Sequence, residues 1–260
     1  MKLLMRRTLC DSIPLKPGSL VLLDEHEAKH LTSVLRMGPG AEFELLDGSG
    51  HKAKAALVFQ GKKVFAETLE APHTDARFTS VPVHLAMSMI KGDAMEWVVE
   101  KAVEMGVRTL TPLETEFNVI KIHKRGAETF QDRFQRIADQ AIKQCGRLDR
   151  MTVLTPVVFE EVLQQKKHFI WLDEELSRSG LPKDHLSQIL PHLSPRSEVS
   201  LFVGPEGGFS PSERSRLLQL TSSEKHEITR AGLGSLILRA ETAALMGASL
   251  LVGNEYGRKK

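Results

Sequence analysis

Hydrophobic and polar residues alternate in short runs over about the first seventy positions, a pattern that predicts β-strands. Turns such as Asp47-Gly48-Ser49-Gly50 separate these runs and supply glycine where positive φ is needed. Residues 25–35 instead place apolar side chains at helical spacing, up to Gly38-Pro39-Gly40. Short strands joined by glycine turns predict a small β-barrel. The expected strands cover residues 20–23, 41–46, 53–59 and 64–69.

A break near residues 71–75 separates this part from one in which strands and helices alternate. Such alternation is typical of an α/β fold with a mostly parallel sheet. We therefore expect a β-barrel domain at 1–72 and an α/β domain at 76–260. In the helix at 93–105, Asp93 and Glu96 have capping-box spacing, and Gly106 is expected to end the helix. The other expected elements are strands at 81–89, 107–112, 168–172, 199–203 and 226–228, helices at 128–145 and 240–252, and a loop with one short helix at 177–195.

Composition excludes several classes of protein. The 35 Lys and Arg against 33 Asp and Glu give a net charge of +2, which is too balanced for a polybasic binder. At 41% hydrophobic residues the chain is not disordered, and at 5% aromatic residues an aromatic base-stacking sheet is not expected. Cys10 and Cys145 cannot build a disulfide framework. With no secretory signal and no apolar run long enough to span a membrane, we expect a cytoplasmic protein that does not enter the membrane.

A glycine loop follows the expected strand at 199–203. The loop, Gly204-Pro205-Glu206-Gly207-Gly208, leads into a helix start at which Ser210 and Glu213 form a capping box and Pro211 takes the first helical position. Such a loop exposes backbone N–H groups where an α/β sheet usually binds its ligand. Glu206 would repel a phosphate, so the loop favours a neutral or cationic ligand. The alternative is a tight turn whose glycines serve only the backbone.

Known phosphate and metal motifs do not account for this loop. Neither a dinucleotide-binding glycine motif nor a P-loop is present. His26 and His30 lie four positions apart, but no third ligand accompanies them, so no metal site is expected.

A second dense segment runs from Arg230 to Ala244. Gly232 and Gly234 lead into the apolar residues 236–238, which are followed by Arg239 and Glu241. Small residues then recur along the next helix, which allows another backbone to approach or a core to pack tightly. By itself, the segment is also explained as a glycine-led entry into a core helix with Arg239 and Glu241 paired at the surface.

Basic residues gather on the helix expected at 128–145. Eight basic residues outnumber four acidic ones between 121 and 150, a local excess of 8 − 4 = +4. Basic side chains on one helix face supply sequence-independent contacts to RNA phosphates, although a solvated helix face is the alternative. The expected RNA-binding residues are Arg133, Arg136, Lys143 and Arg147 on this helix and its end, extended by Arg36 in the barrel and Lys91 at the domain junction.

Taken together, the glycine loop and the second segment resemble the SPOUT methyltransferases, and within them the RsmE family of 16S ribosomal RNA uridine-N3 methyltransferases. The stretch Val34-Leu35-Arg36-Met37-Gly38-Pro39-Gly40 is similar to that family's PUA-like β-barrel, and Gln144-Cys145-Gly146-Arg147 matches a helix end. Four positions depart from the family's usual residues, namely Lys143, Met151, Ser235 and Leu236.

The resemblance implies a C-terminal SPOUT domain with a deep trefoil knot, S-adenosylmethionine as cofactor, and a homodimer that acts on 16S ribosomal RNA or the small ribosomal subunit. It also implies a reaction without a metal. The catalytic candidates are Arg239, which would stabilise the uracil anion or a phosphate, and Glu206 and Glu241, either of which could accept the proton or orient Arg239. The cofactor-binding residues it implies are Leu172, Gly204, Pro205, Gly207, Gly208, Leu233, Gly234, Ile237 and Leu238.

Two other functions remain open at this point. One is a non-catalytic RNA-binding or ribosome-assembly protein that keeps the fold but has lost the cofactor. The other is a SPOUT methyltransferase that acts on another RNA.

Overall fold

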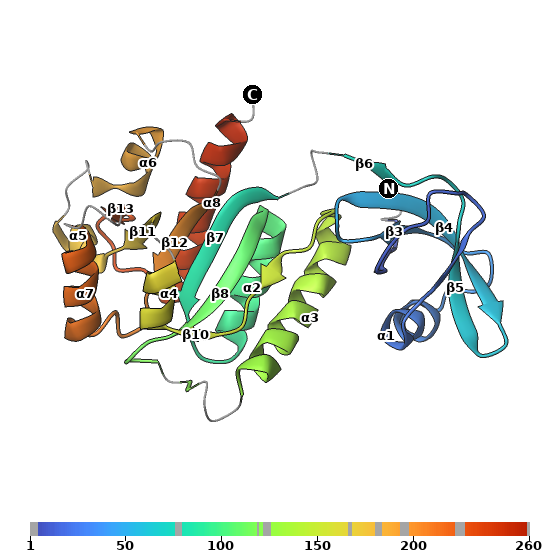
Figure 1. The fold of residues 1–260 in the computed structure, drawn as a ribbon, viewed down its shortest axis with the longest axis horizontal. Coiled ribbons are helices and arrows are strands. Elements are labelled where there is room, and N and C mark those ends of the chain that lie inside the picture. The colour runs from blue at the N-terminus through green and yellow to red at the C-terminus, as the bar shows by residue number, and fades with distance from the viewer. Residues whose placement is uncertain are drawn as a thin grey trace. The chain divides into compact units, whose positions relative to one another are not determined.

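A computed structural model of the chain (Figure 1) describes residues 5–75, 80–118, 120–121, 126–165, 168–179, 184–192, 198–221 and 227–258. Contacts divide the chain into two compact units. The first is Met1–Thr79 with Asp139–Arg150, and the second is Ser80–Ala138 with Met151–Lys260. The expected boundaries, 1–72 and 76–260, do not include the return of residues 139–150 to the first unit.

The first unit is built on a six-stranded sheet, which contains the four strands that the alternating pattern predicts and two short strands that it does not. Its strands are β1 (Arg7–Leu9), β2 (Leu20–Leu22), β3 (Glu42–Leu46), β4 (His51–Gln60), β5 (Lys63–Thr68) and β6 (His73–Thr74). The order is β1-β3-β4-β5-β2, with β6 paired to β4. Only the β1–β3 pairing is parallel among those described. The inward-facing residues Phe43, Leu45 and Leu57 are fully buried and form the core of this unit with Leu31.

The helix expected at 25–35 consists of two different turns. Helix α1 (Glu25–Lys29) begins at Asp24, whose side chain accepts a hydrogen bond from the backbone N–H of Glu27. The chain then widens into a π-helix, η1 (His30–Val34), which buries Leu31 in the sheet core.

The end of helix α3 (Ala127–Cys145) packs within the first unit through a buried ion pair. Nζ of Lys143 donates to Oε1 of Glu27, and Oε2 of Glu27 accepts a hydrogen bond from the Thr8 hydroxyl. Arg7 also donates to the carbonyl oxygens of Lys143 and Gln144, at 3.2 and 3.1 Å. Burial by itself raises the pKa of Glu27. The hydrogen bonds from Lys143 and Thr8 lower the pKa by more than burial raises it, so it lies below its usual value.

This packing buries two of the basic residues that are expected on an exposed face of the helix. Lys143 and Arg147 are only 8% and 5% exposed. Nε of Arg147 pairs with Asp149 at 3.2 Å. The prediction that these two residues form part of an exposed RNA-binding face is therefore wrong. Helical periodicity shows which side chains share a face, but it does not show that the end of the helix is covered by another part of the chain.

The second unit contains a seven-stranded, fully parallel sheet, as expected for an α/β fold. Its main order is β10-β8-β7-β12-β11-β13, and β9 pairs with β8. The strands are β7 (Val81–Ser88), β8 (Val107–Glu114), β9 (Thr152–Val153), β10 (Val157–Val158), β11 (His168–Leu172), β12 (Val199–Val203) and β13 (Glu227–Ala231). Position 226, where the last strand is expected to begin, lies outside the described residues.

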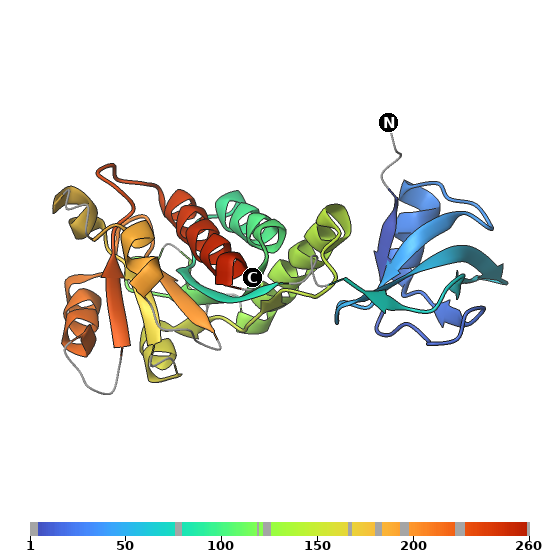
Figure 2. The same ribbon diagram turned by 90° about the horizontal axis from the view of Figure 1, so that it is seen from above.

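Helices lie on both sides of this sheet (Figure 2). Besides α3, they are α2 (Asp93–Met105), α4 (Phe159–Gln165), α5 (Glu174–Ser179), α6 (Leu186–Ile189), α7 (Pro211–Thr221) and α8 (Ala240–Arg258). Helix α2 ends at Gly106 as predicted, but its N-cap is Gly92, without a side-chain cap. The capping box expected at Asp93 is therefore wrong, because Asp93 is already the first helical residue.

Helix α8 packs against α2, β7 and β12 through its small residues. A Cβ added at Gly247 would lie 2.8 Å from Leu201 Cδ2 and 3.0 Å from Leu172 Cδ1. Glycine at this position therefore lets α8 approach the strands closely. The small-residue face that the sequence shows thus packs against the chain's own sheet.

The buried ion pair gives a test of the first unit. Replacing Lys143 with Ala leaves the Glu27 carboxylate buried without its cation, so we expect the free energy of unfolding to fall by about 3–5 kcal/mol. Urea denaturation followed by circular dichroism measures this change.

Lys54→Ala, an exposed position on β4, is the control and is expected to change stability by less than about 0.5 kcal/mol. The double variant Glu27→Leu with Lys143→Met should recover most of the loss, because no charge is then left unpaired. Equal effects of the Lys143 and Lys54 substitutions would contradict the role of the pair.

Candidate functional site

A cavity of about 600 Å³ opens at the carboxyl ends of three neighbouring parallel strands. Leu172, Val203 and Ala231 line it at the ends of β11, β12 and β13. The glycine loop, the second segment and Lys91 complete the lining. The carboxyl edge of a parallel sheet is where α/β proteins bind small molecules. The structure therefore brings together the two segments that the sequence singles out.

Gly208 shows why the glycine loop needs its composition. Its φ is +72°, and an added Cβ would lie 2.8 Å from Oε1 of Glu174. The backbone N–H of Gly208 donates to the Pro205 carbonyl at 2.9 Å and closes the turn. The positive φ is what favours glycine here, whereas the Glu174 carboxylate is the end of a flexible side chain that could move aside.

The predicted capping box at the start of α7 is confirmed. The backbone N–H of Ser210 donates to Oε2 of Glu213 at 2.9 Å, and the N–H of Glu213 donates to the Ser210 hydroxyl at 3.3 Å. Glu213 also accepts a hydrogen bond from the N–H of Glu116 through its other oxygen, at 2.8 Å. One carboxylate thus holds the glycine loop against the loop that follows β8.

The second segment is an exposed apolar loop. Leu233 is buried, whereas Leu236 and Ile237 are 75% and 65% exposed and still line the cavity. The loop is anchored at Gly232, whose N–H donates to the Asp184 carbonyl at 2.8 Å and whose carbonyl accepts from the N–H of Leu186 at 2.9 Å. Exposed apolar side chains beside a cavity indicate a surface that a ligand covers.

An ion-pair cluster centred on Asp173 holds the base of the cavity. The Asp173 side chain is fully buried and directly follows β11. Nη1 and Nη2 of Arg214 donate to its two carboxylate oxygens at 2.7 and 3.0 Å, and Nε of Arg230 donates at 2.9 Å. Both guanidinium groups also lie over the ring of Trp171, at 5.1 and 5.3 Å from its centroid. The cluster joins β11 to α7 and β13, the elements that carry the two loops.

The electrostatics of Asp173 favour its charged form. Burial by itself raises the pKa of Asp173, but the hydrogen bonds from Arg214 and Arg230 lower it more, so the pKa lies below its usual value. Asp173 is therefore a fixed anion at neutral pH rather than a group that exchanges protons there.

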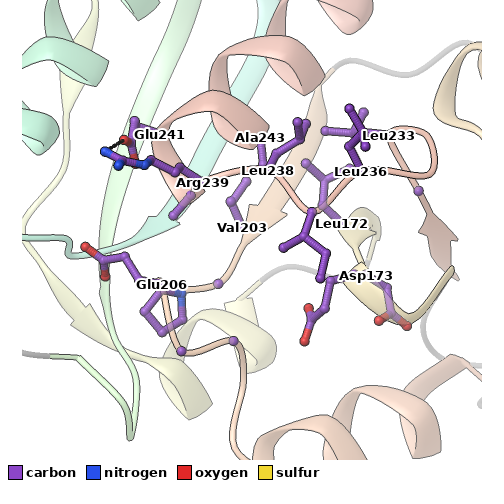
Figure 3. Close-up of a pocket in the computed structure, with 18 of the residues that line it drawn as sticks. Leu172, Asp173, Val203, Glu206, Leu233, Leu236, Leu238, Arg239, Glu241 and Ala243 are labelled. Atoms are coloured by element: carbon purple, nitrogen blue, oxygen red, sulfur yellow. Dashed lines mark ion pairs between the residues drawn. The ribbon is translucent and has the colours of Figure 1, made fainter. Parts of the chain in front are cut away.

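The three catalytic candidates lie on the same side of the cavity. Figure 3 shows Arg239, Glu241 and Glu206 there, with Leu172, Leu233 and Leu236 on the opposite side. The Arg239 side chain is 86% exposed, and its Nη1 lies 3.9 Å from Oε1 of Glu241, which is 18% exposed. Glu206 is exposed on the glycine loop and makes no hydrogen bond or ion pair with another described residue.

The predicted cofactor-binding residues also gather at this cavity, with one exception. Gly234 does not line it and has a φ of +110° in the approach to the apolar residues. Those that do line it are Leu172, Gly204, Pro205, Gly207, Gly208, Leu233, Ile237 and Leu238.

The remaining RNA-binding candidates are exposed. Lys91 lines the cavity, Arg133 pairs with Glu96, and Nε of Arg136 donates to the Asp132 carbonyl. Arg36 has a φ of 55°, the only positive value at a non-glycine residue in the described part of the chain.

Several lining residues escape the sequence analysis. Asp173 and Glu174 follow the apolar run 168–172 directly, and polar residues just after a buried strand are a usable signal for a site. Phe117 does not line the cavity but lies beside the glycine loop. It is 45% exposed, and its Cβ lies 3.4 Å from the position of a Cβ added at Gly207. No sequence signal connects Phe117 with the glycine loop, because the two are joined only through the fold.

Comparisons with known proteins identify the family. Residues 78–252 match the family model described as RNA methyltransferase domain, and residues 23–69 match the RNA methyltransferase PUA domain. A relative from Bacillus subtilis named ribosomal RNA small subunit methyltransferase E is 30% identical over 229 residues, 86% of each chain. The chain belongs to the ribosomal RNA small subunit methyltransferase E family. A member from Aquifex aeolicus is 27% identical and covers 90% of this chain and 95% of its own.

Solved structures of methyltransferases share the fold. A putative methyltransferase from Legionella pneumophila in complex with S-adenosylmethionine is 29% identical, with a TM-score of 0.79 over 96% of this chain and 97% of that one. The methyltransferase E of Neisseria gonorrhoeae, bound to S-adenosylmethionine, is 26% identical, with a TM-score of 0.76 over 94% and 95%. The expected class, a SPOUT α/β domain with an N-terminal PUA-like domain, is confirmed. The trefoil knot stays a prediction, because strand order and register do not define how the chain threads.

Two further findings concern membrane-spanning helices and metal sites. Across the residues that the structure describes, no helix is both long and apolar enough to cross a membrane. Within the same residues, His, Cys, Asp and Glu form no group of three that could hold a metal ion.

The Asp173 cluster gives a second test. Asp173→Asn leaves two buried or half-buried guanidinium groups without their shared anion, so the free energy of unfolding should fall by about 3–5 kcal/mol. Denaturant unfolding at neutral pH measures this. Glu175→Gln is the matched control, since Glu175 also pairs with Arg214 but is 59% exposed, and it should cost less than about 1 kcal/mol.

The same cluster sets a pH dependence. Because the pKa of Asp173 is lowered in the folded protein, its contribution is complete above the unfolded pKa of about 3.9 and is lost as pH falls through the lower folded pKa. The stability difference between the wild type and Asp173→Asn should therefore shrink below about pH 4. A difference that stays constant in acid would show that the charge of Asp173 does not provide the stabilisation.

Proposed function

We propose that this chain transfers a methyl group from S-adenosylmethionine to N3 of a specific uridine in 16S ribosomal RNA. The observation that carries the proposal is the cavity at the strand ends, which unites the glycine loop with the segment ending in Arg239 and Glu241. The relatives from Legionella pneumophila and Neisseria gonorrhoeae bind S-adenosylmethionine, and the curated relatives are named as methyltransferases of small-subunit ribosomal RNA.

The residues present fit this cofactor. A volume of about 600 Å³ lies within the range of small-molecule sites. The apolar side chains of Leu172, Leu233 and Leu236 suit an adenine ring, and the backbone of the glycine loop offers hydrogen-bonding groups. Glu174 and Glu206 also line the cavity, and carboxylates that would repel a phosphate are compatible with a positively charged sulfonium.

When bound, S-adenosylmethionine supplies a methyl group on a cationic sulfur, so that transfer needs an aligned acceptor nitrogen and no covalent enzyme intermediate. The chain must hold the uracil, help to remove its N3 proton and stabilise the negative charge that develops. Arg239 is exposed at the cavity edge and is suited to the last role. Glu206 accepts the proton, because it is exposed and makes no ion pair with another described residue, while Glu241 orients Arg239.

Substrate RNA reaches the site from the exposed side of the cavity. The target uridine has to be unpaired or flipped out of its stack, because N3 is buried in duplex RNA. Lys91 and Arg133 of the α/β domain, 76–260, and Arg36 of the PUA-like domain, 1–72, contact phosphates. A homodimer working in the cytoplasm, where ribosomal subunits assemble, completes the proposal.

Methyl transfer is tested directly. Purified chain is incubated with methyl-labelled S-adenosylmethionine and with 16S ribosomal RNA or small subunits that lack the modification. We expect label in one nucleotide, which nuclease digestion and mass spectrometry identify as 3-methyluridine. Tight, salt-dependent RNA binding without any transfer would instead support the non-catalytic RNA-binding function, and label in another RNA would support a different substrate.

Arg239→Ala tests the catalytic assignment. The side chain has few contacts, so we expect folding and cofactor affinity to stay within about twofold of the wild type, while the transfer rate falls at least about 100-fold. Calorimetric titration with S-adenosylmethionine and single-turnover methylation measure the two quantities. A variant with full activity would rule out the assignment.

Glu206→Gln separates the proton acceptor from the charge stabiliser. Its activity should also fall, but it should recover as pH rises, because hydroxide and the ionised uracil then replace the missing base. Arg239→Ala should show no such recovery. If Glu206→Gln keeps the wild-type rate at every pH, the acceptor is another group.

A further inference from the structure

A second cavity, of about 440 Å³, lies in the same unit as the cofactor cavity. Lys91 lines both cavities, so the two adjoin at this residue. The second cavity is formed by the residues between β7 and α2, the start of α2, residues 120–121 after β8, and the first turns of α3. Its lining residues include Ile90, Gly92, Met95, Ile120, Phe130 and Phe134.

The inner walls of this cavity are apolar and firmly held. Ile90, Met95, Phe130 and Phe134 are nearly completely buried, so their side chains are fixed by packing. The rings of Phe130 and Phe134 stack at 6.2 Å between centroids, on the α3 side. A rigid apolar hollow of this kind suits a flat, largely apolar group such as a nucleobase.

The rim carries a basic excess. Lys91, Lys121 and Arg133 line the cavity against one acid, Glu96. Nζ of Lys121 donates to the carbonyl oxygens of Thr115 and Glu116, at 3.2 and 3.1 Å, which ties Lys121 to the residues that follow β8. Lys91 is exposed and makes no hydrogen bond or ion pair with another described residue.

We propose that this second cavity binds the base of a nucleotide adjacent to the target uridine in the RNA strand. This inference rests on the proposed function. With the uridine at the cofactor cavity and its neighbour in the second cavity, Lys91 contacts the phosphate that joins them. The apolar interior argues against a phosphate alone as occupant, and the basic rim matches the charge of a polynucleotide. The cavity thereby positions the target base and adds selectivity for the neighbouring one.

Filling the cavity tests the inference. Ile120→Trp introduces a large side chain from a loop position, so the packed core is left intact. Leu218→Trp, at an exposed position on α7 outside both cavities, is the matched control. We expect Ile120→Trp to raise the KM for 16S ribosomal RNA at least about tenfold, while the dissociation constant of S-adenosylmethionine stays within twofold. An unchanged KM, or one raised equally by Leu218→Trp, would overturn the inference.

A crosslinking measurement keeps the test independent of turnover. A photoreactive benzoylphenylalanine is placed at position 120 in one protein and at position 218 in another, and each is irradiated with 16S ribosomal RNA. We expect a crosslink from position 120 to a nucleotide adjacent to the methylated uridine, and none from position 218. Crosslinks from position 120 to scattered nucleotides would contradict the site.

The two hypotheses fail in different ways. If the wild type transfers no methyl group, the proposed function fails, while a single crosslinked nucleotide at position 120 still supports a nucleotide site. If the wild type methylates uridine but Ile120→Trp and the crosslink are negative, only the second cavity is wrongly assigned.

Discussion

The carboxylate of Asp173 is the contact on which the geometry of the cavity depends. It is fully buried, and it is bound by Arg214 from α7 and Arg230 from β13. These two elements follow the glycine loop and precede the second loop, so one anion sets the spacing between both walls of the cavity. Stacking of the two guanidinium groups over Trp171 adds an apolar surface that holds them in place. One buried ion-pair cluster thus holds an end of each loop.

The exposed and buried parts of the site have different tasks. The polar atoms of Asp173 and of the capping box at Ser210 and Glu213 form hydrogen bonds within the protein, and these bonds stabilise the fold. Leu236, Ile237 and Arg239 are instead mostly exposed. Under the proposed function, an adenosine covers these two apolar side chains, and their burial contributes to binding through the hydrophobic effect. Under the proposed function, the exposed Arg239, oriented by Glu241, donates to the RNA.

Much of this arrangement could be predicted from local sequence. The glycine loop, the capping box at Ser210 and the parallel strands depend on neighbouring residues and on hydrophobic runs, so their signals lie within short segments. The cofactor and the substrate are predicted from the resemblance of two separated segments to one family. Hydrophobic periodicity alone does not predict them.

The errors have a common physical origin, namely contacts between residues far apart in sequence. Lys143 appears as part of a basic stripe on an isolated helix, but Glu27, more than a hundred positions earlier, draws it into the first unit. Asp173 directly follows a buried strand, which is a local signal, but its bonds to Arg214 and Arg230 are visible only in the fold. The same holds for the contact of Phe117 with Gly207. The wrong prediction of a capping box at Asp93 has a local cause. The helix begins at Asp93 itself, so that Gly92, and not Asp93, is the N-cap.

A crystal structure of the chain grown with S-adenosylmethionine tests the central claim most directly. The account predicts the adenosine against Leu233 and Leu236, the glycine loop around the methionine part, and the methyl group turned toward Arg239 and Glu206. A cofactor bound elsewhere, or a methyl group turned away from Arg239, would contradict it.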